Sequence, residues 1–110
     1  MQEPDGRKLV EYLLNDFRTL STEAKKKYNS VKEAAETGLV KIRNISTAHQ
    51  PDALLGNIRA ACGEILHPLI LGCSSKNPRL VQISLQTIQR MLQFRVLDPV
   101  RSSVFVDHVD

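Results

Sequence analysis

The chain has 110 residues, of which 42% are hydrophobic and 25% charged, and this composition indicates one globular domain with a modest core rather than a disordered chain. Aromatic residues make up only 5% and tryptophan is absent, so leucine, isoleucine and valine must supply most of the buried surface. The net charge of +3 and the pI near 9.1 suit an acidic partner or an anionic lipid surface, but they fall short of a nucleic-acid-binding signature.

No targeting or membrane-spanning segment is expected from the sequence. The first residues lack the basic and apolar regions of a signal peptide, and no apolar run approaches the ~18 residues of a transmembrane helix. Cys62 and Cys73 are the only cysteines, which is too few for a disulfide framework. A reduced, cytosolic setting is therefore predicted.

Two amphipathic helices are predicted in the first half of the chain. The first covers Asp5–Leu20, and Ser21–Glu23 either extends it or begins the next helix. Ser30 followed by Glu33 has the spacing of a capping box, which predicts a second helix over Val31–Ser46. The small residues of this helix would allow a neighbouring helix to cross it closely. The two apolar faces comprise Leu9, Val10, Leu13, Leu14, Phe17 and Leu20, and then Val31, Ala34, Ala35, Gly38, Leu39, Ile42 and Ile45.

Proline and glycine divide the second half into shorter elements. A third helical region is predicted over Asp52–Ile70, and Pro68 is expected to kink it or to split it into two helices. Gly72 predicts the end of that region. Asn77 and Pro78 predict the next helix start, with asparagine as the N-cap and proline at the first helical position.

The helix after Pro78 carries an apolar arc over about half of its circumference, wider than the ~100° stripe of an ordinary surface helix. This arc predicts a helix buried between neighbours, like the inner helix of a stacked solenoid. Part of the arc is expected to face the first three helices and part to face helices that this chain does not contain, which would leave exposed apolar surface near Ile83 and Phe94. The remaining face is polar but uncharged, typical of an exposed face and compatible with partner packing. The arc contains Leu80, Val81, Ile83, Ser84, Leu85, Thr87, Ile88, Met91, Leu92 and Phe94, and the polar face contains Gln82, Gln86, Gln89 and Gln93.

The order of helix starts favours an all-α, armadillo/HEAT-like α-solenoid of which this chain is the N-terminal portion, with about five helices. Asp98–Pro99 repeats the cap-and-proline pattern and predicts a fifth helix over Val100–Val109. The spacing from Pro51 to Pro99 is roughly 48 residues, close to the ~40–47 of HEAT and armadillo units. Residues 1–110 are therefore expected to form one domain, incomplete because the chain stops within an apolar stretch.

The sequence contains no recognisable catalytic constellation, P-loop or CxxC motif, so we predict a protein that is not an enzyme. His49, His67 and His108 are scattered, and a metal site built from Cys62, Cys73 and His67 would match no common zinc spacing. Structural roles for these residues are favoured. We expect no cofactor, no metal, no small-molecule substrate and no nucleic-acid partner.

Basic residues cluster between the first two helices and along the second. A solvated surface is the favoured interpretation, and contact with an anionic membrane or an acidic partner is the alternative. The cluster comprises Lys25, Lys26, Lys27, Lys32, Lys41 and Arg43.

Two segments carry a resemblance to a known family. The Lys25–Ile45 segment contains the run VKEAAE, and the His67–Leu92 segment contains LGCSSKNPRL and IQRML. Their order and spacing resemble the N-terminal DCB (dimerisation and cyclophilin-binding) region of the Mon-type, or monensin-sensitivity, Golgi scaffold proteins, over roughly residues 8–100. These scaffolds are relatives of the large Arf guanine-nucleotide exchange factors and lack the catalytic exchange domain.

The resemblance implies a helical scaffold or adaptor in Golgi–endosome traffic, cytoplasmic and peripheral on trans-Golgi network and endosome membranes. It implies protein partners, namely an Arf-like small GTPase, a Dopey-type protein or a second copy of the chain. The family offers no short binding motif, so it assigns none of these contacts to particular residues. The alternative is a peripheral membrane-binding module that uses the Lys25–Arg43 region.

Overall fold

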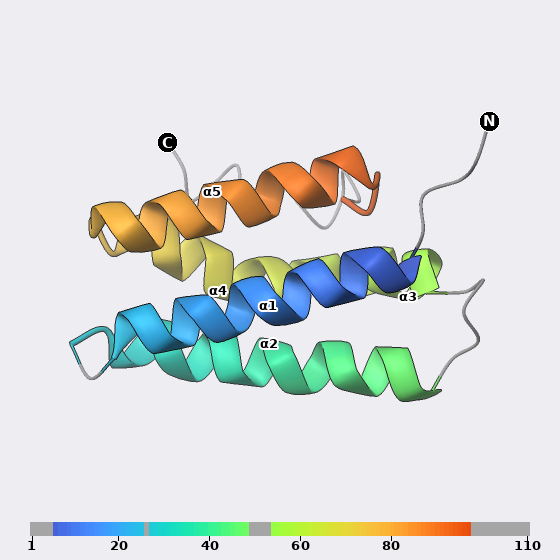
Figure 1. The fold of residues 1–110 in the computed structure, drawn as a ribbon, viewed down its shortest axis with the longest axis horizontal. Helices are drawn as coiled ribbons and strands as arrows, with labels where there is room; N and C mark the ends of the chain where they lie inside the picture. The colour runs from blue at the N-terminus through green and yellow to red at the C-terminus, as the bar shows by residue number, and fades with distance from the viewer. Residues whose placement is uncertain (1–5, 26, 49–53, 98–110) are drawn as a thin grey trace.

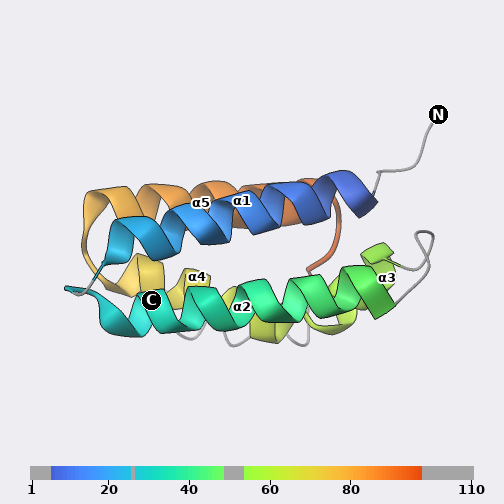
Figure 2. The same cartoon turned by 60° about the horizontal axis from the view of Figure 1, so that its bottom comes forward.

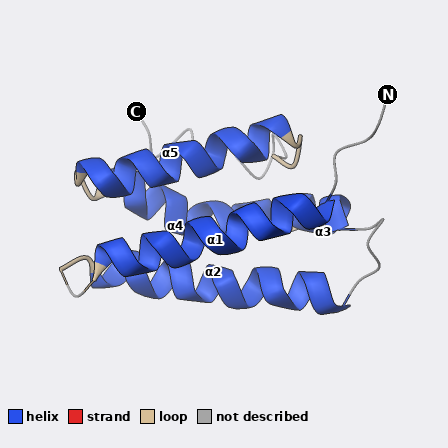
Figure 3. Cartoon of the chain, viewed as in Figure 1, coloured by secondary structure: helices blue, strands red, loops and turns tan. Residues whose placement is uncertain are grey.

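The computed structural model describes residues 6–25, 27–48 and 54–97, and in this part of the chain all regular structure is helical (Figure 3). The helices are α1 (Gly6–Ala24), α2 (Asn29–Ala48), α3 (Leu54–Ala60), α4 (Cys62–Ser74) and α5 (Pro78–Gln93). The all-α prediction is confirmed. The predicted helix over Val100–Val109 lies outside the described residues.

The four long helices form two antiparallel hairpins, α1–α2 and α4–α5, that pack against each other (Figures 1 and 2). Helix α2 contacts α4, and α1 contacts α5, while the short α3 lies at one end and touches α1, α2 and α4. Stacked helical hairpins of this kind are consistent with the N-terminal portion of a helical solenoid.

The core lies where the apolar stripes of the hairpins meet. The predicted stripe of α1 is confirmed, since Leu9, Leu13 and Phe17 are fully buried. The stripe of α2 is confirmed as well, with Ala35 and Ile42 fully buried. Each large aliphatic side chain buried in this way contributes ~1.5–3 kcal/mol, so aliphatic burial supplies most of the stability of a chain without tryptophan.

The turn between α1 and α2 is shorter than predicted. Helix α1 continues to Ala24, so Ser21–Glu23 extends the first helix, and Lys25 then adopts a left-handed conformation (φ 52°). The prediction of a capping box at Ser30 is wrong. The Lys32 N–H already donates to the Tyr28 carbonyl (3.0 Å), so Ser30 lies inside the first turn of α2 and is not its N-cap. Glu33 instead accepts a hydrogen bond from the Asn29 side chain (3.1 Å).

The break in the third helical region lies at Ala61, so the predicted split at Pro68 is wrong. The Ala61 N–H donates to the carbonyls of both Asn57 and Ile58 (3.1 Å each), a tightened turn that ends α3. Helix α4 then runs through Pro68, whose ring has no N–H to offer the Glu64 carbonyl. Burial of that ring against α2 offsets the missing hydrogen bond.

Gly72 lies inside α4 and does not end it, so its predicted role as a stop is wrong. A Cβ atom at Gly72 would collide with Ser84 Oγ of α5, and this close approach explains why a glycine is needed there. The helix ends at Ser74, and Lys76 in the following turn takes the left-handed conformation (φ 62°).

The predicted start of α5 is confirmed in detail. Pro78 is the first helical residue, and the side-chain oxygen of Asn77 accepts hydrogen bonds from the N–H groups of Arg79 (2.9 Å) and Leu80 (3.3 Å). These bonds satisfy two of the N–H groups that a helix start leaves without intrahelical partners.

Helix α5 packs against both α1 and α4, and α4 is buried over a wider part of its circumference than α5. At 100° per residue, the buried residues of α4 cover roughly 200° of its circumference, against roughly 140° for α5. The buried face of α5 centres on Leu80, Ser84 and Met91, whereas Leu85 and Leu92 are exposed.

A polar contact joins α1 to α5 within this otherwise apolar interface. Asp16 is 8% exposed and lies 3.1 Å from Thr87 Oγ1 and 3.6 Å from Arg90 Nε. Thr87 Oγ1 also lies 2.8 Å from the Ile83 carbonyl, and its single proton can serve only one of these acceptors at a time. Burial raises the pKa of the Asp16 carboxyl, and the Arg90 charge and the Thr87 hydrogen bond oppose this shift.

We expect Gly38→Ala to destabilise the domain by about 1–3 kcal/mol, because the new Cβ would lie 2.6 Å from the buried Phe17 ring and force the core to shift. Gly56→Ala is the matched control, since Gly56 is an exposed helical residue with no atom near its Cβ position. This control should gain about 0.5–1 kcal/mol. Urea denaturation measures both effects, and a Gly38→Ala variant as stable as Gly56→Ala would contradict the close crossing.

We expect the stability of the wild type, relative to Asp16→Asn, to fall as pH rises above the ordinary aspartate pKa of 3.8. The folded state then binds more protons at Asp16 than the unfolded state, so ionisation on raising the pH favours unfolding. Urea denaturation of both proteins from about pH 4 to pH 7 measures this difference. Glu36→Gln removes an exposed carboxylate and serves as the control. A pH-independent difference between wild type and Asp16→Asn would refute the raised pKa.

Candidate functional site

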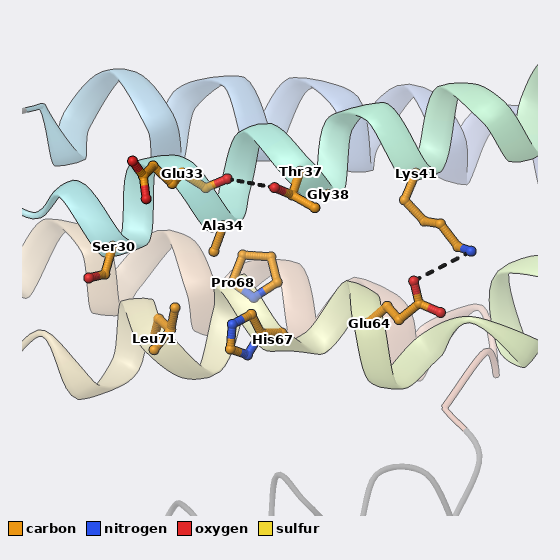
Figure 4. Close-up of a pocket in the computed structure, with 10 residues that line it drawn as sticks. All are labelled: Ser30, Glu33, Ala34, Thr37, Gly38, Lys41, Glu64, His67, Pro68 and Leu71. Atoms are coloured by element: carbon orange, nitrogen blue, oxygen red, sulfur yellow. Dashed lines mark hydrogen bonds and ion pairs between the residues drawn. The ribbon is translucent and has the colours of Figure 1, made fainter.

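A groove of about 540 Å³ runs between α2 and α4 (Figure 4). Small or rigid residues form its floor, with Ala34 and Gly38 on α2 and Pro68 on α4. A second hollow of about 460 Å³ shares Ser30 and Leu71 with it, so the two openings form one continuous depression. This depression is a concave surface that follows both helices toward the α1–α2 turn.

Charged side chains border the groove without forming a catalytic arrangement. Lys41 of α2 reaches across to Glu64 of α4, with 3.4 Å between Nζ and Oε2 (Figure 4). Both side chains are exposed, so this ion pair contributes little to stability. His67 lies on the exposed side of α4, and Thr37 donates its hydroxyl to the Glu33 carbonyl of its own helix (3.0 Å). The groove is therefore a concave surface bordered by side chains of both charges, Lys41 and Glu64.

The predicted basic cluster divides into two groups. Lys25 and Lys27 are exposed in the α1–α2 turn, with Lys32 half-buried in the first turns of α2. Lys41 is engaged with Glu64, and Arg43 lies farther along α2 toward the other end. Lys26 lies outside the described residues. A single basic surface from Lys25 to Arg43 therefore does not form in the described part of the chain.

The fold adds a basic residue that the sequence pattern did not indicate. Lys76 lies in the α4–α5 turn, which is at the same end of the molecule as the α1–α2 turn (Figures 1 and 2). An ion pair between Arg79 Nε and Glu23 Oε1 (2.9 Å) joins the start of α5 to the end of α1, next to these two turns. Exposed Lys25, Lys27 and Lys76 thus share one end of the fold, and we call them the lysine end.

The predicted glutamine face is exposed along its whole length, and α1 lies beside most of it. Gln86, Gln89 and Gln93 line a hollow of about 260 Å³ together with Tyr12 of α1 and Arg90 of α5. Gln82 is exposed on the same helix but does not line this hollow. Neither Tyr12 nor Arg90 was identified from the sequence, because only the α1–α5 packing brings them together.

The exposed apolar surface of α5 differs from the prediction. Ile83 is only 5% exposed and Phe94 is half-buried, so the predicted surface near these residues is wrong. Leu85 (51% exposed) and Leu92 (58%) project from the helix instead, with half-buried Val81 on the same flank. We call Val81, Leu85 and Leu92 the leucine flank.

The cysteines and His67 occupy separate environments. Cys62 is fully buried in the core, Cys73 is half-buried, and burial raises the pKa of the Cys73 thiol. Within residues 6–25, 27–48 and 54–97, no three His, Cys, Asp or Glu side chains gather as a metal site would require. His49 and His108 lie outside these ranges. No helix in the described ranges has the length and apolarity needed to cross a membrane.

Comparison with known proteins agrees with the resemblance noted in the sequence. A family model for the DCB domain, described as a Mon2/Sec7/BIG1-like dimerisation and cyclophilin-binding domain, matches residues 4–109. The monensin-resistant homolog 2 of Caenorhabditis elegans is 63% identical over 94 residues, covering 84% of this chain and 6% of that protein. The MON2 homolog of Homo sapiens is 36% identical over 91 residues, covering 83% of this chain and 5% of that protein.

The MON2 homolog of Drosophila melanogaster is 35% identical over 94 residues, covering 86% of this chain and 5% of that protein. No solved structure shows a significant match to the chain. The chain thus spans only 6% of the length of the worm protein and 5% of the human and fly proteins. The family model extends over nearly all of its residues, and the chain belongs to the Mon2/Sec7/BIG1-like DCB family.

Proposed function

We propose that this domain is a non-catalytic scaffold or adaptor module of Golgi–endosome membrane traffic, which binds protein partners through its helical surfaces. The partners we propose are an Arf-like small GTPase, a Dopey-type protein or a second copy of the domain. Its proposed location is cytoplasmic, peripheral on trans-Golgi network and endosome membranes. Membership of a family described by dimerisation and cyclophilin binding supports a role in protein contacts.

The leucine flank is the observation that carries this proposal. Leu85 and Leu92 each expose more than half of their surface and lie on one flank of the same helix. None of the three residues of the flank is charged, and the two arginines of α5 turn toward acidic side chains of α1, Arg79 to Glu23 and Arg90 to Asp16. Exposed apolar surface without charge favours packing against another protein.

We expect Leu85→Gln/Leu92→Gln to weaken partner binding by about tenfold, because the substitutions remove apolar surface that a bound partner would bury. Purified domain is mixed with GTP-loaded Arf-like GTPases and with Dopey-type proteins, and the bound fraction is measured. Sedimentation of the domain alone measures self-association. Val40→Gln is the matched control, since Val40 is 54% exposed on α2, away from the leucine flank.

Two outcomes would count against the adaptor proposal. The first is a wild-type domain that recovers neither class of partner and sediments only as a monomer. The second is equal binding by wild type and the double variant, which would remove the leucine flank from the interface even if partners bind elsewhere.

A second candidate function is peripheral binding to anionic membranes, favoured by the lysine end. Three exposed lysines from two separate turns lie at one end of the fold. Each lysine held near an anionic surface contributes ~1 kcal/mol. The lysine end modifies the predicted Lys25–Arg43 region, since it adds Lys76 and leaves out Lys41, Arg43 and the half-buried Lys32. Lys26 lies outside the described residues.

We expect Lys25→Glu/Lys27→Glu/Lys76→Glu to lower flotation with liposomes containing anionic phospholipids by at least about tenfold. The control is Arg18→Glu/Arg43→Glu/Arg59→Glu, which changes the net charge equally but alters exposed residues outside the lysine end. Flotation that falls equally in both variants would indicate a general charge effect. Flotation unchanged by the lysine substitutions would exclude this end as the membrane contact.

A further inference from the structure

The hollow between α1 and α5 is lined only by side chains that can donate hydrogen bonds. Its lining comprises Tyr12, Gln86, Gln89, Arg90 and Gln93, around a volume of about 260 Å³. None of these side chains carries a negative charge, and Arg90 supplies a permanent positive charge. We call this hollow the glutamine pocket.

Arg90 is held in place by contacts on its inner side. Its Nε lies 3.6 Å from Oδ2 of the buried Asp16, and its guanidinium carbon lies 4.1 Å from the centre of the Tyr12 ring. The Tyr12 ring in turn meets Phe94 edge-on, with 6.3 Å between ring centres and an interplanar angle of 69°. The guanidinium is therefore oriented before any ligand arrives, which lowers the entropic cost of binding.

The contacts that fix Arg90 leave part of its hydrogen-bonding capacity available. The ion pair to Asp16 uses Nε, whereas the two terminal nitrogens carry four further N–H groups. In the described part of the chain, Asp16 is the acidic side chain paired with Arg90, and its carboxylate is already engaged with Thr87. The side chain of Arg90 is 26% exposed, so a ligand in the pocket can reach it.

These donors fit a small planar anion. Arginine binds carboxylates through two parallel N–H groups, and the glutamine amides can add donors from the side of α5. The volume suits a single side chain rather than a cofactor. The lysine end, which also attracts anions, is built from separate turns, so the two surfaces can be distinguished by experiment.

We propose that the glutamine pocket binds the side-chain carboxylate of an aspartate or glutamate on a partner protein. This inference rests on the proposed adaptor function and specifies the chemistry that one of its surfaces recognises. The leucine flank lies on the other side of the exposed glutamines of α5, so one partner could place an apolar residue on the flank and an acidic residue in the pocket.

The test is an NMR titration of the 110-residue chain with a hexaglutamate peptide. Resonances of Arg90 Nε–H and of the Gln86, Gln89 and Gln93 side-chain amides should shift together and saturate. Gln89→Glu, which places a negative charge in the pocket, should weaken this binding by about tenfold. Gln82→Glu is the matched control, because it makes the same change on the same helix outside the pocket and should alter affinity less than about twofold.

Three outcomes would overturn the proposal. The shifts could be confined to the lysine end, the two glutamate variants could weaken binding equally, or inorganic phosphate could saturate the pocket while the peptide leaves it unchanged.

The adaptor function is tested separately through Leu85 and Leu92. Partner binding that depends on these leucines, together with a pocket that does not respond, would reject the pocket alone. A responsive pocket without any recovered partner would reject the adaptor function alone.

Discussion

Two glycines, Gly38 on α2 and Gly72 on α4, lie where the packing of neighbouring helices leaves no room for a Cβ atom. At Gly38 the Phe17 ring of α1 lies 2.6 Å from the place of a Cβ atom, whereas Pro68 of α4 lies at an ordinary van der Waals distance of 3.4 Å. Gly72 of α4 faces Ser84 of α5. Because neither glycine carries a Cβ atom, the Phe17 ring packs directly against the backbone of α2 and the Ser84 side chain against the backbone of α4. The close packing of α1 on α2 and of α5 on α4 depends on these two glycines.

The same contacts determine which surfaces of the domain stay open. Where α2 and α4 meet at Gly38 and Pro68, the small floor leaves the groove bordered by longer side chains. On the opposite side, Ser84 points toward α4 and Thr87 toward Asp16 of α1, which together fix the rotation of α5 about its own axis. That rotation leaves the leucine flank on one side of the helix and the glutamines on the other. The candidate binding surfaces thus follow from the packing of the core.

The sequence predicts the fold well where a pattern is local. The stripes of α1 and α2 and the Asn77–Pro78 start depend on spacing and on hydrogen bonds within a few residues. Prediction failed where a distant partner decides the outcome. Gly72 is a local signal for a helix end, but the approach of Ser84 requires a glycine inside the helix. Pro68 is a local signal for a helix break, yet its ring packs against α2 within a continuous α4, and the break lies at Ala61.

The surface residues show the same division between local pattern and distant contact. Exposure of the glutamines follows from their spacing, but the pocket they line requires Tyr12, which is 74 residues before Gln86 in the chain. Asp16 and Thr87 are polar residues within a buried interface, where apolar side chains would pack with less desolvation cost. Asp16 helps to orient Arg90, because the guanidinium group lies beside this buried carboxylate and over the Tyr12 ring. Apolar residues therefore supply the stability of the α1–α5 interface, whereas its polar residues give the adjoining surface a defined hydrogen-bonding geometry.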